Sequence, residues 1–369
     1  MTSVTWAQVL AWRMRRQFVE RPADEPAEEV ARRLAGVQAQ VASAAELAVA
    51  VRQARPRQAQ AGRADVGRAL FDDRSLVKTW TMRGTLHLMP ADEVAAYLVL
   101  CGAARHWEKP SWQKTFGATP ADLEAIAGAA TEALAGGAAL TREELTAAVV
   151  ERTGSRHLAE VLGSGWGTLL KPLAWWGVLC HGPAQGTRVT FTAPERWLPG
   201  WTGLPAVEDA ARTVIRAFLG AHGPATPDMF DNWLMRKLNR KKDVRAWFGA
   251  AEDDLATIEV DGVEMYVLRE HRDELMATEP STSVRLLGAF DQYVLGAGTS
   301  ATYLVPAERR KEVSRAAGWI SPVVLYEGRV AGVWEAKDGD VVVKPFEDIP
   351  VAQLKDETDR LRALLDSKG

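Results

Sequence analysis

The amino-acid sequence predicts a mainly α-helical protein with some β-structure: three tandem winged-helix (helix-turn-helix) units followed by a small C-terminal β-sheet module. The first reason is that helices followed by a β-hairpin recur three times, at a spacing of about 100 residues. The second is a strand-rich remainder after residue 280. The third is length: at roughly 100–200 residues per domain, a chain of 369 residues is expected to form more than one domain. The composition, 47% hydrophobic and 25% charged, is that of a globular protein.

The first unit is predicted over residues 1–90. Apolar residues at helical spacing predict four helices, over 4–19, 28–35, 44–53 and 65–71. Ser43 is the expected N-cap of the third helix. Stretches rich in β-formers on both sides of Arg83-Gly84 predict a hairpin over 77–89.

The same order predicts a second unit over 118–195. Its helices are expected over 120–134, 141–152, 155–162 and 166–176, the last interrupted near Pro172. Its strands are expected over 177–181 and 187–192.

A third unit is predicted over 205–270 and a β-module over 280–369. The third unit has expected helices over 207–219, 226–234 and 241–247, and a hairpin around Asp261-Gly262, a strong turn signal. The module has expected strands over 285–290, 323–326, 330–334 and 340–344, and a terminal helix over 351–365.

Charge and cysteine content narrow the class of protein. The net charge is -3, yet residues 1–90 carry 14 Lys and Arg against 9 Asp and Glu, a local excess of +5. A local basic surface is the expected mark of a nucleic-acid partner, although a solvated helical surface is the better explanation for any single arginine. Only Cys101 and Cys180 are present, which argues against a disulfide-rich secreted protein. No signal peptide and no apolar run of about 18 residues is visible, so we expect a cytoplasmic protein without a membrane segment.

The sequence lacks the motifs of metal sites, phosphate-binding loops and serine hydrolases. The six histidines lie at 87, 106, 157, 181, 222 and 271, with no metal-binding spacing. No phosphate-binding G-x-x-x-x-G-K-[ST] motif occurs, and Leu162 breaks the G-x-S-x-G pattern of a hydrolase nucleophile at Ser164. The sequence therefore predicts neither a metal nor a cofactor.

The tripeptide Gln38-Ala39-Gln40 carries chemistry that suits one reaction. In an extended segment the two amides project to the same side. They can hold a water and solvate positive charge, but they accept a proton far less readily than a carboxylate. An N7-alkylated purine is already cationic and leaves without an acid catalyst, so two amides are sufficient. No lysine precedes Lys78, which favours hydrolysis over a Schiff-base mechanism.

The chain resembles the winged-helix DNA glycosylases of the AlkZ/YcaQ family. The matching segments follow the family's order along nearly the whole chain: Leu34–Gln40, Thr79–Leu88, Gly165–Gly167, Trp176–Leu179, Phe290–Gly296 and Gly328–Trp334. The resemblance implies three winged helices curved into a C, with a C-terminal β-element. It also implies a partner, double-stranded DNA that carries alkylated bases, and we expect a monomer.

The resemblance assigns Gln38 and Gln40 to catalysis. They match the Gln-x-Gln signature of one branch of the family, whose other branch has Gln-x-Asp. Their implied roles are to position a water and to stabilise an oxocarbenium-like sugar. The missing aspartate argues against a base-catalysed step. The branch is associated with self-resistance to DNA-alkylating natural products, including removal of azinomycin-type interstrand crosslinks.

A crosslinked base cannot swing into a closed pocket, so the resemblance implies an open basic channel and a hairpin that probes the duplex. The candidate hairpins are Met82–Thr85 and the turns of the β-module. Phosphate contacts are predicted for a first-unit group, Arg52, Arg55, Arg57 and Arg63, and for a third-unit group, Arg236, Lys237, Arg240, Lys241, Lys242 and Arg245. Arg83 and His87 line the cavity of the glutamines in one interpretation and are structural residues of the wing in the other.

Two other functions fit the sequence. A transcription regulator would bind a defined operator without releasing a base. A toxin-sequestering protein would bind the free alkylating agent. The sequence leaves open which adduct is preferred and whether crosslinks are unhooked.

Overall fold

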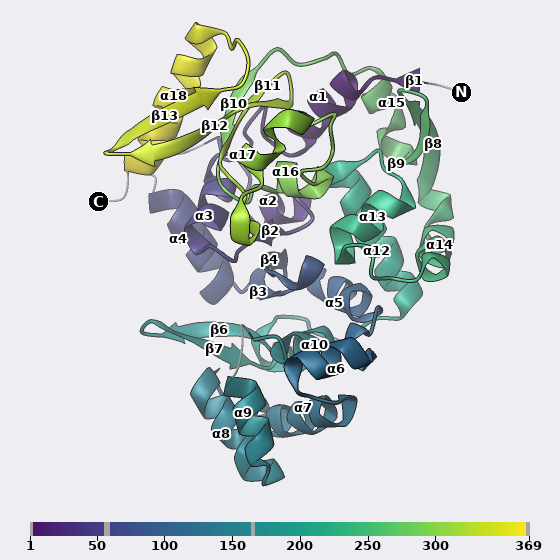
Figure 1. Ribbon diagram of the computed structural model, residues 1–369, viewed down its shortest axis with the longest axis vertical. Coiled ribbons are helices and arrows are strands. Elements are labelled where there is room, and N and C mark those ends of the chain that lie inside the picture. The colour runs from purple at the N-terminus through teal and green to yellow at the C-terminus, as the bar shows by residue number, and fades with distance from the viewer. Residues whose placement is uncertain (1–2, 55–59, 164–166, 367–369) are drawn as a thin grey trace.

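The protein combines many helices with small sheets, as Figure 1 shows. The computed structural model describes residues 3–54, 60–163 and 167–366. Within these ranges the strands form three three-stranded sheets, ordered β2-β4-β3, β5-β7-β6 and β1-β8-β9, and one four-stranded sheet, β10-β11-β12-β13. The mixed helical and β-fold expected from the sequence is confirmed. No helix in the described ranges is long and apolar enough to cross a membrane.

The first unit surrounds the sheet β2-β4-β3. Its elements in chain order are α1 (Trp6–Arg16), α2 (Ala27–Arg33), β2 (Val37–Gln38), α3 (Ala42–Ala50), α4 (Gln60–Phe71), β3 (Leu76–Trp80), the 3-10 turn η1 (Met82–Gly84) and β4 (Leu86–Pro90). The hairpin is confirmed. Ser43 is not an N-cap, because α3 starts two residues earlier than expected, and its N-cap, Val41, has no side chain that can cap.

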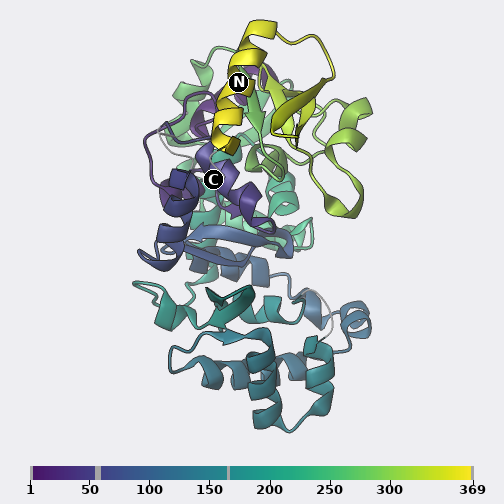
Figure 2. The same ribbon diagram turned by 90° about the vertical axis from the view of Figure 1, so that its left-hand side faces the viewer.

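Most of the second unit forms the lower end of the molecule in Figures 1 and 2, whereas its first helix lies level with β3 and β4. Its elements are α5 (Val94–Gly102), η2 (His106–Glu108), α6 (Pro110–Phe116), α7 (Pro120–Leu134), β5 (Leu140–Thr141), α8 (Arg142–Thr153), α9 (Arg156–Gly163), α10 (Leu170–Trp175), β6 (Cys180–Gln185), β7 (Arg188–Thr192) and α11 (Pro194–Trp197). The helix expected from residue 166 begins at Leu170. Pro172 does not interrupt it, because it lies in the first turn, where no backbone N–H is needed.

The third unit contains α12 (Val207–His222), α13 (Pro227–Met235), α14 (Lys241–Ala250), η3 (Glu252–Asp254), β8 (Leu255–Val260), β9 (Val263–Leu268), η4 (Arg269–His271) and α15 (Arg272–Met276). The predicted hairpin at Asp261-Gly262 is confirmed. The third strand of its sheet, β1 (Ser3–Val4), comes from the start of the chain and runs parallel to β8.

The C-terminal module is a four-stranded antiparallel sheet with one long helix. It contains β10 (Val284–Leu287), α16 (Gln292–Ala297), η5 (Ala307–Arg309), α17 (Arg310–Val313), η6 (Ala316–Gly318), β11 (Val323–Tyr326), β12 (Arg329–Lys337), β13 (Asp340–Pro345) and α18 (Val351–Asp366). The strands β11 to β13 and the terminal helix lie where the sequence predicted them.

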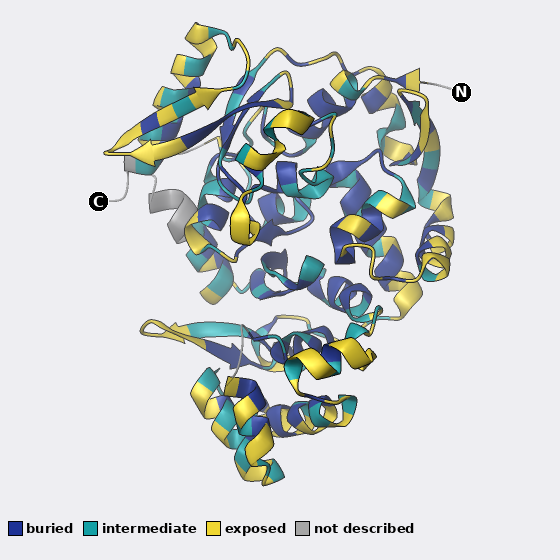
Figure 3. Cartoon of the chain, viewed as in Figure 1, coloured by how far each residue is buried: buried dark blue, intermediate teal, exposed yellow. Residues whose placement is uncertain are grey.

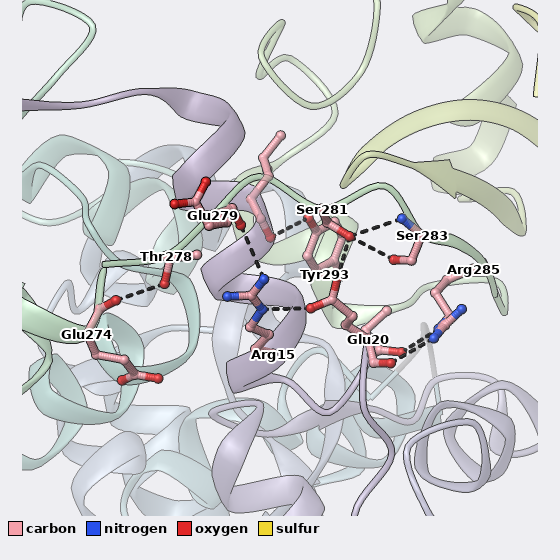
Figure 4. Close-up of polar contacts among 11 residues, drawn as sticks. Arg15, Glu20, Glu274, Thr278, Glu279, Ser281, Ser283, Arg285 and Tyr293 are labelled. Atoms are coloured by element: carbon pink, nitrogen blue, oxygen red, sulfur yellow. Dashed lines mark hydrogen bonds and ion pairs between the residues drawn. The ribbon is translucent and has the colours of Figure 1, made fainter. Parts of the chain in front are cut away.

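Helix α1 packs outside the sheet of the first unit. Val9 and Trp12 pack with β8 and β9, and Leu10 and Met14 pack with the C-terminal sheet. Just after α1, the Glu20 carboxylate accepts hydrogen bonds from Arg15 and Ser281, as Figure 4 shows. The start of the chain therefore ties the third unit to the C-terminal module.

A common pairing recurs in the three units. A short segment ahead of α3, α8 and α13 pairs with the second strand of the hairpin in its unit. Val37–Gln38 pairs with β4, Leu140–Thr141 pairs with β7, and Ala225 forms a bridge to Tyr266 of β9. This pairing has no counterpart among the sequence predictions, because a strand of one or two residues leaves no periodicity.

Candidate active site

A sharp turn at the end of α2 directs the chain into β2. Ala35 and Gly36 both have positive φ, 55° and 98°, and the Gly36 amide donates to the Ala31 carbonyl at 2.8 Å. A Cβ on Gly36 would lie 2.5 Å from the Met89 sulfur. Only glycine satisfies both the conformation and this contact, so Gly36 determines where Gln38 lies.

The tripeptide occupies the end of β2. Gln38 is the register partner of His87 in β4, and the Ala39 amide donates to the Leu86 carbonyl at 2.7 Å. Gln38 is the last residue of β2, Gln40 lies in the bend that follows, and Ala39 between them is 1% exposed. Gln38 is buried at 7% exposure, whereas Gln40 is exposed. One amide therefore lies inside the protein and the other at the surface.

The first unit lacks the helix cap that the other two units have at this position. Thr141 caps α8 through the Glu144 amide, and Thr226 caps α13 through the Met229 amide. In the first unit the equivalent segment is Gln38–Val41, and α3 has no side-chain cap. Val41 stands at the N-cap of α3, so the capping hydrogen bond that the other two helices have, worth about 1 kcal/mol, is missing directly after the glutamines.

Arg83 holds the inner glutamine. It adopts a left-handed conformation, φ 59°, in η1. Its Nη1 donates to the Trp233 carbonyl at 2.7 Å, and its Nη2 lies 3.5 Å from Oε1 of Gln38. Burial lowers the pKa of Arg83 to about 10, with a further contribution from Arg236, so the guanidinium stays charged at neutral pH. Since a carbonyl oxygen has two lone pairs, Gln38 can still accept a second hydrogen bond.

His87 is a neutral neighbour of Gln38. It is completely buried, and its Nδ1 lies 3.0 Å from the Thr85 carbonyl, which can only accept, so Nδ1 carries the hydrogen. Burial, followed by the charge of Arg83, lowers its pKa to about 3. The buried Nε2 has no hydrogen-bond partner among the described residues, and neither has Oγ1 of its register neighbour Thr79. These atoms extend the polar surface around Gln38, and burial keeps His87 from contacting DNA directly.

Buried imidazoles make the stability depend on pH. The pKa of both His87 and His222 is lowered to about 3, chiefly by burial. Unfolded histidine titrates near pH 6.5, so below that pH the unfolded chain binds protons that the folded protein does not. These two histidines alone are therefore expected to lower the free energy of unfolding by about 2–3 kcal/mol per pH unit below about pH 6, and His181, whose pKa burial also lowers to about 3, makes the fall steeper.

Urea denaturation between about pH 7 and pH 5 measures this loss. The exposed His157 provides the control, since its replacement by asparagine should leave the slope unchanged. A free energy that stays level over this range would contradict the prediction.

Positive side chains from all three units gather beside Arg83. Lys171 of α10 lies against Gly84, with its Nζ 3.6 Å from where a Cβ would stand. Burial and then the charge of Arg236 lower the pKa of Lys171, and Arg236 also lowers that of Arg83. Sequence reasoning missed Lys171, because nothing near it in the chain points to the glutamines.

The third-unit basic group lies at the turn between α13 and α14. All its members are exposed: Arg236, Lys237, Arg240, Lys241, Lys242 and Arg245. The Lys237 ammonium lies 3.6 Å from the Asp228 carboxylate, but an exposed pair of this kind is weak and does not prevent phosphate binding.

The first-unit basic group needs one correction. Arg52 is completely buried in a two-point ion pair with Asp291, at 2.7 and 2.8 Å, so it cannot contact DNA in this structure. The Arg52 charge is neutralised by the Asp291 carboxylate inside the protein. The sequence did not predict this pair, because the two residues are 239 positions apart. Arg55 and Arg57 lie outside the described residues. Arg63 lies in α4, and its side chain is likewise outside the description.

The candidate probing turns differ in exposure. Met82–Gly84 packs against α13 through Arg83, and Gly328 is buried against Leu10. The turn Asp338-Gly339 is exposed at the end of β12 and β13, as Figure 3 shows.

The chain is similar to DNA glycosylases along most of its length. The family model described as "DNA glycosylase AlkZ-like" matches residues 31–366. An "Interstrand DNA cross-link repair glycosylase" from Streptomyces sahachiroi is 48% identical over 360 residues, which are 96% of this chain and 94% of that protein. The solved structure of the Streptomyces sahachiroi DNA glycosylase AlkZ matches with a TM-score of 0.92 and 47% identity, over 99% of this chain and 97% of the other. The resemblance inferred from the motifs is confirmed, and the regulator and the toxin-binding protein are not favoured.

Proposed function

This chain belongs to the AlkZ-like family of DNA glycosylases, hydrolases of N-glycosyl bonds, and we propose that it removes N7-alkylated purines, including those in interstrand crosslinks, with Gln38 and Gln40 at the reacting bond. The observation that carries this assignment is a pair of neighbouring amides, Gln38, buried at the end of β2 and contacted by Arg83, and Gln40, exposed in the bend directly after it.

Hydrolysis of the glycosidic bond of a cationic purine requires only that the protein position a water and stabilise the sugar cation. The cationic purine is a good leaving group, so no acid is needed. Gln38, oriented by Arg83, positions the attacking water, and Gln40 at the surface solvates the developing positive charge on the sugar. Neutral His87 offers a weak acceptor nearby. The product is an abasic site, and no covalent intermediate forms.

The DNA-binding part of the proposal is three winged-helix units in a C-shaped arrangement, acting as a monomer. The repeated pairing ahead of α3, α8 and α13 supports three equivalent units. The exposed turn between α13 and α14, together with Arg83 and Lys171, supplies positive charge for phosphates. Arg55, Arg57 and Arg63 stay predicted contacts.

Crosslinks are included because a relative of 48% identity is named for their repair. The deciding experiment incubates the purified protein with a duplex that holds one N7-guanine interstrand crosslink. We expect separated strands and alkali-sensitive abasic sites. Borohydride should trap no protein–DNA adduct, although Lys171 brings an amine near the site. A crosslink that survives while N7-methylguanine is released would restrict the enzyme to monoadducts, and release of neither base would overturn the proposal.

A further inference from the structure

A groove of about 250 Å³ begins at the proposed catalytic motif and runs along α3. Its first lining residue, Val41, directly follows Gln40. Ser43, Leu47 and Ala50 then line it at helical spacing. From Val41 to Ala50 a helix rises by about 13 Å, so the groove leads well away from the reacting bond.

The C-terminal module forms the opposite wall. The Trp334 indole lines it and is held in place by a hydrogen bond from Nε1 to the Leu287 carbonyl, 2.9 Å long. Trp319 is 41% exposed and is braced by Phe290, whose ring centroid lies 5.0 Å away in an edge-to-face arrangement. The two walls meet where Leu47 packs on Gly288, since a Cβ there would lie 2.9 Å from the leucine. The groove is therefore preformed.

The lining determines what fits. It is mostly apolar, it contains no cation, and Glu46 is its charged member. A phosphate would be repelled here. An apolar group joined to a cationic purine would bury apolar surface, stack on Trp319 and gain from the Glu46 carboxylate. A 150 Å³ cavity accommodates benzene, so about 250 Å³ holds a larger aromatic group.

We propose that this groove binds the bulky aromatic substituent of an N7-purine adduct while the glycosidic bond lies at Gln38 and Gln40. The inference rests on the proposed function and deepens it, because it makes the enzyme select large apolar adducts over small ones. Trp319 is then a specificity-determining residue that contacts the substituent and takes no part in bond cleavage.

The test compares two duplexes that differ only in the N7 substituent of one guanine: methyl, or 4-phenylbutyl. Single-turnover base release is measured against enzyme concentration, which separates the half-saturating concentration from the maximal rate. Trp319→Ala should raise the half-saturating concentration for the phenylbutyl adduct about tenfold. For the methyl adduct, Trp319→Ala should change the half-saturating concentration by less than about twofold.

A second variant fills the groove without removing a contact. Ala336 is exposed on β12 and lines the groove, so Ala336→Trp should reproduce the selective loss. The matched control is Val342→Trp, because Val342 is exposed and pairs with Glu335, on the other face of the same strands. It should leave both adducts unaffected.

The outcomes separate the two proposals. If the wild-type protein releases neither base, the proposed function fails. If it releases both and the variants change them equally or not at all, the groove does not bind the substituent. If Trp319→Ala converts a dimer into a monomer in sedimentation velocity, a second copy of the chain occupies the groove and the inference is overturned.

Discussion

Replacing both Gln38 and Gln40 by alanine is expected to lower the single-turnover rate of base release by at least about 100-fold. The two amides are the groups proposed to orient the water and to solvate the sugar cation, and neither of them caps α3. Release of N7-methylguanine from a duplex measures the rate. Fluorescence anisotropy with the same duplex should show a dissociation constant within about threefold of the wild type.

The two positions are expected to differ. Gln38→Ala removes the partner of Arg83 and leaves a small buried gap, whereas Gln40→Ala changes only the surface. The control is Gln113→Ala in α6, because the Gln113 side chain only donates to the Glu108 carbonyl. A double variant that keeps its rate within about fivefold of the wild type would remove the glutamines from the mechanism.

Replacing Asp291 by alanine is expected to lower the free energy of unfolding by about 3–5 kcal/mol, because it leaves the Arg52 charge buried without a counter-charge. Both side chains are completely buried. Arg52 also donates to the carbonyls of Gln17 and Ala48, at 2.9 and 2.8 Å. The pair joins the end of α3 to the N-cap of α16, so its loss weakens the contact between the first unit and the C-terminal module. Urea denaturation near pH 7 measures the effect.

A double-mutant cycle isolates the pair. Arg52→Met combined with Asp291→Asn should cost less than the sum of the two single changes, because no uncompensated charge remains. The exposed Lys355, which pairs with Asp359, provides the comparison, and Lys355→Met should have no measurable effect. Equal losses at the buried and the exposed pair would contradict the argument.

The sequence determined most of the elements and the candidate motif. Helix α7 begins and ends as predicted because it buries one face, which appears in the sequence as helical periodicity. Strand β11 matches its predicted bounds because it is a short apolar run that ends at a turn. The motif Gln38-Ala39-Gln40 was visible in the sequence, yet only the family-wide resemblance raised it above an ordinary surface pair.

Only the tertiary structure shows which side chains that are distant in the sequence lie in contact. Arg52 lies in a predicted DNA-binding stretch, but a carboxylate 239 residues away buries it. Lys171 belongs to the second unit but lies against Gly84 of the first. Trp319 belongs to the C-terminal module but lines a groove that starts beside Gln40. Local sequence records the backbone conformation and the buried face of each segment. The local sequence does not show which distant charged or aromatic side chain a segment will contact, because those contacts form only when the units pack together.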